Sequence, residues 1–188
     1  LNPWWGIIKY NDFTGLAAQV GNYNIPYQVI IYLMTLLPLN ALYAYKIVSI
    51  IFDFVLAIST AMLVCSFAKN NRRLKAILTY SAVLLSATVI FNSSFWAQCD
   101  SIYTSFIILA ILFLHKDKPI ASFVFTGIAF AFKLQTVFIL PVLLYYWIST
   151  KKISILHFFI IPAVDVIMCL PAIIMGRPFI DIITIYAE

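Results

Sequence analysis

The sequence predicts an all-α protein, a polytopic transmembrane helix bundle, and three observations favour this fold class. The chain of 188 residues is 64% hydrophobic and only 10% charged, far from the soluble average of about half apolar and a quarter charged residues. Its mean hydropathy is +1.01. Lys and Arg exceed Asp and Glu by 12 to 7 and gather in short loops between apolar runs. We therefore interpret the positive charge as a topology signal and expect no nucleic acid partner.

Residues 1–40 are predicted to form an extracytoplasmic loop with interfacial helices. Four aromatic residues lie among polar ones near its start, a density typical of a membrane interface belt: Trp4, Trp5, Tyr10 and Phe13. Residues 27–37 are apolar but only about half as long as a crossing requires, and Pro26 and Pro38 flank them. We expect a short interfacial or re-entrant helix there.

Residues 41–188 are predicted to form the transmembrane bundle. Three basic loops separate its apolar runs and hold eight of the twelve positive charges, at residues 68–75, 115–118 and 150–152. The apolar runs predict spans at about residues 42–67, 76–92, 101–114, 119–132, 135–149 and 153–175. Because an out-and-back pair of helices separates each basic loop from the next, all three share one face, which the positive-inside rule assigns to the cytoplasm. Pro162 and Pro171 are expected to kink the last span.

Three ionisable residues, Asp53, Asp165 and Lys133, lie at or near membrane depth, where a charge costs at least about 2.5 kcal/mol. Each aspartate is either a hydrogen-bond partner for a neighbouring helix or part of a site. Lys133 is either a snorkelling interfacial lysine or a ligand-binding one. Lys46 shares a helix face with Asp53.

The chain lacks the motifs of several enzyme classes. No Gly-rich phosphate loop, HExxH or GxSxG can be read, which argues against ATP-driven transport and zinc proteolysis. Cys65, Cys99 and Cys169 lie far apart, and the sequence holds only 2 histidines. We expect no disulfide framework and no metal site, so a divalent metal cofactor has no support in the sequence.

Five motifs follow one another along nearly the whole chain: Pro3-Trp4-Trp5, residues 22–27 (NYNIPY), residues 45–53 (YKIVSIIFD), residues 92–103 around Trp96-Ala97-Gln98-Cys99-Asp100, and Phe132-Lys133-Leu134-Gln135. In this order they resemble the GT-C membrane glycosyltransferases. Within that superfamily the chain is most similar to bacterial proteins related to the GPI mannosyltransferases and to the ER glucosyltransferases of lipid-linked oligosaccharide synthesis. The commonest family form has Gly where this chain has Ala97.

The resemblance implies an inverting hexosyltransferase. Its donor would be a polyprenyl-phosphate sugar carrying a hexose such as mannose or glucose, and its acceptor an extracytoplasmic glycan, lipid or protein. It also implies a multi-pass protein surrounded by membrane lipids, in the bacterial plasma membrane, or in the ER membrane if the source is eukaryotic.

The resemblance also suggests where the site lies. The family's catalytic acid precedes the Pro-Trp element, so we expect that acid and a first span to lie before Leu1; Asp100 would serve as base only if the upstream acid does not. The expected substrate-binding residues are Trp96, Gln98, Asp100, Tyr103, Lys133, Gln135 and Arg177, with Lys46 and Asp53 as structural or site-lining residues. We predict that the two outer turns that carry Asp100 with Gln98 and Lys133 with Gln135 meet beside the outer end of the Asp53 helix, and that these four residues line one cavity.

Two alternatives stay open. The chain could be a fragment of a secondary transporter or channel, in which Asp53, Asp165 and Lys133 form a proton or ion relay. It could also be a scaffold subunit without a site. Polar residues gather toward the outer ends of the predicted spans, which favours the transferase over the relay.

Overall fold

The structure, a computed structural model, describes residues 2–21 and 23–186, and every element in these two ranges is a helix. The all-α prediction is confirmed for this part of the chain, while Asn22 of the second motif lies outside it. In chain order the elements are α1 (Asn2–Asn11), η1 (Asp12–Ala17), α2 (Ile25–Thr35), α3 (Ala41–Phe67), α4 (Arg72–Leu84), α5 (Ala87–Ile90), η2 (Phe91–Phe95), α6 (Asp100–His115), α7 (Pro119–Phe132), η3 (Leu134–Ile139), α8 (Leu140–Thr150), η4 (Ile155–Phe159), α9 (Ile160–Ile174), α10 (Phe179–Ile183) and η5 (Thr184–Tyr186).

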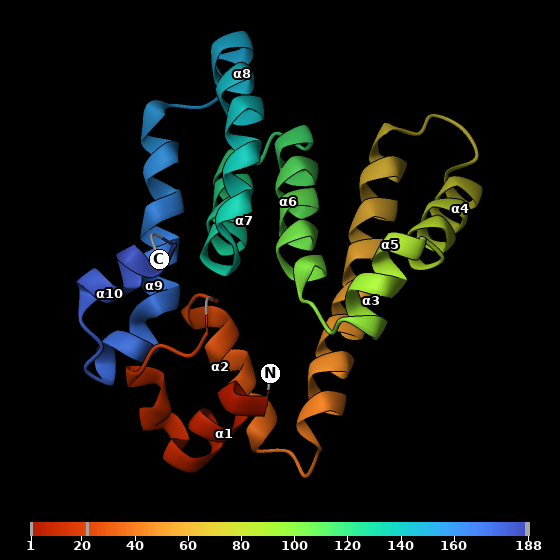
Figure 1. The fold of residues 1–188 in the computed structure, drawn as a ribbon. Helices are drawn as coiled ribbons and strands as arrows, with labels where there is room; N and C mark the ends of the chain where they lie inside the picture. Colours follow the sequence, from red (N-terminus) through yellow and green to blue (C-terminus); the bar gives the residue numbers. More distant parts are fainter. Residues whose placement is uncertain (1, 22, 187–188) are drawn as a thin grey trace.

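The long helices form a bundle with two different ends. Helices α3, α6, α7 and α9 lie side by side, and α1 and α2 gather at one end (Figure 1). The turns α3–α4, α6–α7 and α8–α9, which carry the three basic loops, lie at the opposite end. The basic loops therefore share one end of the bundle, as the out-and-back pattern predicts. That this end is cytoplasmic stays a prediction.

Helix α3 is the longest element, and it packs closely against α6. It begins at an N-cap, Asn40, whose side chain accepts a hydrogen bond from the backbone N–H of Leu42 at 2.9 Å. Small residues on its buried face let α6 approach so closely that the Ser105 hydroxyl lies 3.4 Å from the backbone oxygen of Phe52. This contact fixes the register between the two helices.

Two helical stretches are long and apolar enough to cross a membrane, Ala41–Phe67 and Ile155–Ile174. A third, Arg72–Leu84 with Ala87–Phe95, is bent by 47° at its break and has the required composition only as a pair. The helices expected to form the other predicted spans are apolar but shorter. Their length alone does not establish that they cross, so the six-span topology belongs to the proposal below.

Several predicted spans begin or end differently from expectation. The predicted span 76–92 is interrupted after α4, where Ser86 takes an extended backbone conformation. The last two spans begin as 3₁₀ turns, η3 and η4, before α8 and α9. Pro141 and Pro162 lie in the first turns of these α-helices, where a missing N–H costs little. Pro171 alone lies inside α9.

The N-terminal segment packs onto the bundle end and buries Trp5, while Tyr10 and Phe13 stay exposed. Trp5 is 8% exposed and its ring lies edge-on to that of Tyr45, 6.1 Å between centroids. This corrects the expectation that Trp5 faces a membrane interface, although Tyr10 is exposed. Helix α2 is short, as predicted, but it begins at Ile25, so Pro26 lies in its first turn instead of flanking it. Protein contacts cover Tyr27 and Ile31.

Candidate functional site

Asp100 is placed by an unusual turn between α5 and α6. Residues Phe91–Phe95 wind as a π-helix, a form that occurs mostly as single turns near functional sites. The chain then reverses at Ala97, whose φ of 54° lies in the left-handed region. That region favours glycine, so the backbone at Ala97 is held in a conformation that costs free energy for a residue with a Cβ atom. Asp100 follows as the first residue of α6.

Lys133 is placed by the end of α7. Its backbone is extended (φ −155°, ψ 130°) and its N–H donates to the carbonyl of Ala129, which closes the last turn. The following 3₁₀ turn, η3, carries Gln135 and Thr136. Because α6 begins and α7 ends at the same end of the bundle (Figure 1), Asp100 and Lys133 approach each other from two different turns.

The two charged groups form an ion pair within a small polar network. Lys133 Nζ donates to Asp100 Oδ1, with the side chains 22% and 30% exposed. Asn92 Nδ2 donates to the second carboxylate oxygen, Oδ2, at 3.0 Å and to Gln98 Oε1 at 3.0 Å. Lys133 Nζ also lies 5.4 Å from the ring centroid of Tyr103, within the range of a cation–π interaction. The predicted proximity of Asp100 and Lys133 is confirmed.

A cavity of about 520 Å³ opens beside this network. Its lining residues are Tyr23, Phe132, Lys133, Leu134, Gln135, Val137 and Phe138. Lys133 and Gln135 thus line it as predicted. Asp100 and Gln98 do not; Asp100 reaches the cavity through its contact with Lys133, and Gln98 is exposed beside the network. The prediction that all four residues line one cavity is therefore wrong for Asp100 and Gln98.

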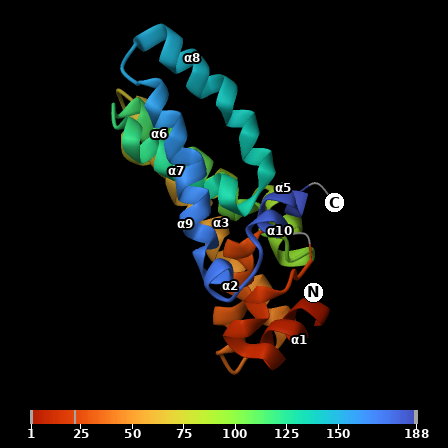
Figure 2. The ribbon, with the colours of Figure 1, turned by 90° about the vertical axis from the view of Figure 1, so that its left-hand side faces the viewer.

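An apolar crevice adjoins the polar cavity. Figure 2 shows that α8 is tilted relative to α7 and α9. The helices are farthest apart at the start of α8, directly after η3. The crevice under α8 has a volume of about 270 Å³ and is lined by Thr126, Phe130, Thr136, Val137, Leu140, Phe158, Ile161 and Pro162. Val137 lines both spaces, so the polar cavity and the apolar crevice meet at η3.

The remaining predicted residues near the network have different environments. Asp53 is buried, and its Oδ1 accepts a hydrogen bond from the Ser101 hydroxyl, directly after Asp100. This is the interhelical structural role considered above. Lys46 is half-buried on the same helix. Trp96 has 67% of its surface exposed and does not line the cavity.

Arg177 does not join the cavity lining. It is 3% exposed, and its guanidinium donates to Gln28 Oε1 at 3.5 Å and to Gln19 Oε1 at 3.2 Å. Burial lowers the pKa of this guanidinium. The contacts tie the turn after α9 to α2 and to the segment after η1, which is a structural role for a residue expected to bind substrate.

Asp165 lies apart from Lys133. It lines a separate cavity of about 180 Å³ together with Pro162, Val166, Cys169, Phe179 and Ile182. Its Oδ1 atom is buried and has no hydrogen-bond partner among the described residues. The relay alternative would need Asp53, Asp165 and Lys133 in one chain of contacts. The structure brings Asp53 near Lys133 through Ser101 and Asp100. The cavity that Asp165 lines meets the apolar crevice at Pro162 but shares no lining residue with the cavity at Lys133.

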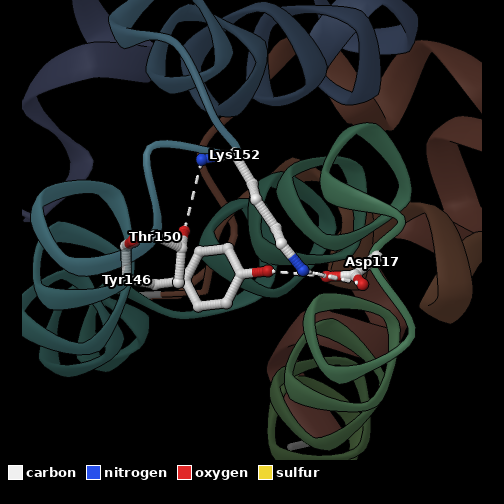
Figure 3. Close-up of polar contacts among 4 residues, drawn as sticks. All are labelled: Asp117, Tyr146, Thr150 and Lys152. Carbon is white, nitrogen blue, oxygen red and sulfur yellow. Dashed lines mark hydrogen bonds and ion pairs between the residues drawn. The ribbon is translucent and has the colours of Figure 1, made fainter.

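A second Lys–Asp pair lies at the basic end of the bundle. Lys152 Nζ lies 2.8 Å from Asp117 Oδ1, and the Tyr146 hydroxyl donates to the same oxygen at 3.0 Å (Figure 3). The hydrogen bond from Lys152, and then that from Tyr146, lowers the pKa of Asp117. The Lys152 and Asp117 side chains are 53% and 60% exposed, so solvent surrounds this pair.

Sequence reasoning missed Asn92 and Tyr23 as members of the site. Asn92 stands in a run of small polar residues that reads as a loop, and only the π-turn brings its amide to Asp100. Tyr23 belongs to the second motif, but its approach to the cavity depends on how the N-terminal segment packs. Burial raises the pKa of the Tyr23 phenol, so it stays protonated as a donor.

Comparisons of this chain with family models, with curated proteins and with solved structures find no match. The resemblance to GT-C glycosyltransferases therefore rests on the ordered motifs. Among the described residues, no group of three His, Cys, Asp or Glu side chains could hold a metal ion.

Proposed function

We propose that this chain is an integral membrane glycosyltransferase of the GT-C type that moves a hexose from a polyprenyl-phosphate donor to an extracytoplasmic acceptor. The observation that carries the proposal is the position of Lys133. Its ammonium stands at the edge of a cavity of about 520 Å³, beside an apolar crevice and at the bundle end opposite the basic loops.

The two adjoining spaces suit an amphiphilic donor. A phosphate at Lys133 would find a cation at the hydrocarbon boundary, where such charge pairs are favourable. The crevice under α8, which meets the polar cavity at Val137, would then receive the first part of the apolar chain. A lipid phosphate satisfies both environments, whereas a soluble nucleotide sugar would leave the crevice unused.

The proposed reaction is a displacement with inversion at the anomeric carbon. The bond between this carbon and the phosphate oxygen breaks, the phosphate leaves with the electron pair, and the acceptor hydroxyl forms the new bond while its proton passes to a base. Lys133 stabilises the charge that develops on the departing phosphate. Both oxygens of Asp100 already accept hydrogen bonds, from Lys133 and Asn92, so we give Asp100 the role of counterion and leave the base unassigned.

The polar groups around the cavity suit a sugar. Gln135 and Tyr23 line it, and amide and phenol groups donate to and accept from hydroxyls. The exposed Gln98 and Trp96 stand on the neighbouring turn, where they are available to the acceptor. In this proposal all six predicted spans cross the membrane and the basic loops face the cytoplasm.

Turnover of a labelled donor tests the proposal. The full-length protein that contains this chain, purified and reconstituted in vesicles, is given polyprenyl-phosphate mannose or glucose with a mixture of membrane glycan and lipid acceptors, and release of polyprenyl phosphate is measured. Lys133→Ala should reduce release by about 100-fold, the size of effect typical for losing one charge-stabilising donor. Lys116→Ala, the same change at the basic end, should leave the rate within twofold of wild type. Equal rates for both variants would refute the role of Lys133.

A further inference from the structure

The Asn92 side chain holds one orientation in the network. Its amide nitrogen carries two hydrogens, and each is used, one toward Gln98 Oε1 and one toward Asp100 Oδ2, both at 3.0 Å. A carboxylate only accepts hydrogen bonds, so the nitrogen of Asn92 and not its oxygen must face Asp100. The Oδ1 atom of Asn92 is buried and lacks a hydrogen-bond partner within the described chain, a cost the residue bears in this position.

The charges of Lys133 and Asp100 balance, because the Asn92 side chain adds no charge to the network. Lys133 contributes one positive charge and Asp100 one negative charge, so an incoming phosphate must share Lys133 with Asp100. If Asp100 depended on Lys133 alone, releasing the lysine would leave a half-buried carboxylate without a donor. Asn92 supplies a second donor without adding charge.

We propose that Asn92 is a positioning residue, which holds the Asp100 carboxylate by a neutral hydrogen bond so that Lys133 is free to bind the phosphate of the donor. This inference rests on the proposed function. It predicts that donor affinity depends on the charge of residue 92 as well as on its shape.

The substitution Asn92→Asp tests the charge at nearly constant shape. Two adjacent carboxylates would face Lys133 at neutral pH and repel a phosphate, and the affinity for polyprenyl phosphate should fall about tenfold. Because adjacent carboxylates raise the pKa of one of them, the pair takes up a proton as the pH falls toward 5. The difference between the affinities of Asn92→Asp and wild type for polyprenyl phosphate, measured at the same pH, should then become smaller. The other titratable groups around the network are Tyr23, Asp53, Cys99 and Tyr103, and all are present in both proteins.

Two further variants separate charge from structure. Asn92→Ala removes both donors without adding a charge, so its loss of affinity should be smaller, about threefold, and independent of pH. Asn71→Asp makes the same substitution at an exposed position of the basic end and should bind like wild type. Melting temperatures of all proteins identify any variant that fails to fold.

Binding of sugar-free polyprenyl phosphate in nanodiscs, measured from pH 5 to 8, gives outcomes that separate this inference from the proposed function. A pH-dependent deficit in Asn92→Asp, together with the smaller and pH-independent loss in Asn92→Ala, supports the positioning role. If wild type binds and transfers sugar but Asn92→Asp binds equally well at every pH, the positioning role is wrong and the glycosyltransferase proposal stands. A wild-type protein that binds polyprenyl phosphate but transfers no sugar overturns the proposed function and leaves the charge effect measurable. A wild-type protein that does neither overturns both.

Discussion

The two ends of the bundle each hold a lysine–aspartate pair, and the pairs differ in their surroundings. Lys133 and Asp100 are 22% and 30% exposed, and Asn92 and Tyr103 add further contacts. Lys152 and Asp117 are 53% and 60% exposed on surface turns. Water and salt screen the second pair far more than the first. The same two residue types therefore form a partly buried pair beside a cavity at one end and an exposed surface contact at the other.

The difference follows from how each pair is placed. A π-turn and the end of α7 hold the first pair beside a cavity. The second pair joins two surface turns, where Asp117 and Lys151 both take left-handed backbone conformations. A fixed pair next to a cavity can exchange partners with a ligand, whereas a solvated pair gains little from any single partner.

The largest expected contrast between the two ends is their exposure to opposite sides of the membrane. With Cys65, Cys99 and Cys169 replaced, a cysteine at position 98 should react with an impermeant thiol reagent added to intact cells. A cysteine at position 118 should react only after the membrane is made permeable, because the proposed topology places the basic loops in the cytoplasm. The opposite pattern would invert the topology and remove the site from the outer face.

The next contrast is energetic coupling within each pair. A double-mutant cycle with Asp100→Ala and Lys133→Ala should give a coupling energy of about 1–3 kcal/mol, since a half-buried charged hydrogen bond lies in that range. The cycle with Asp117→Ala and Lys152→Ala should give a much smaller coupling energy, because solvent and salt screen the exposed pair. Thermal unfolding in detergent supplies both values, and equal coupling at the two ends would remove the basis of the comparison.

The smallest expected effect is the pH dependence of the exposed pair. The folded-state pKa of Asp117 lies below its ordinary value of 3.8 because Lys152 and Tyr146 donate to it. Its stabilising contribution is therefore present above pH 3.8 and is lost as the pH falls through the lowered pKa. Wild type should melt slightly above Asp117→Asn at pH 6 in low salt, and the difference should shrink as the pH falls below 3.8 and in high salt. A difference that persists in both conditions would show that Asp117 acts through packing.

The sequence predicted the elements that depend on local signals. Long apolar runs between charged loops indicate helices, and the out-and-back spacing of the basic loops places them at one end, as Figure 1 shows. The order of the motifs was enough to bring Asp100 and Lys133 together, because each stands at the end of a helix whose direction the spacing determines.

Other side-chain contacts follow only from the tertiary structure. Nothing local indicates that Asn92 reaches Asp100, because that contact depends on a π-turn and on the left-handed backbone at Ala97. Arg177 looked like an exposed outer cation, yet α2 and the segment after η1 cover it. From the sequence one can predict the helices, the position of the basic loops at one end of the bundle, and the proximity of the turns that carry Asp100 and Lys133. Side-chain partners depend on how each helix is rotated and how distant segments pack, and these long-range contacts leave no periodic signal in the chain.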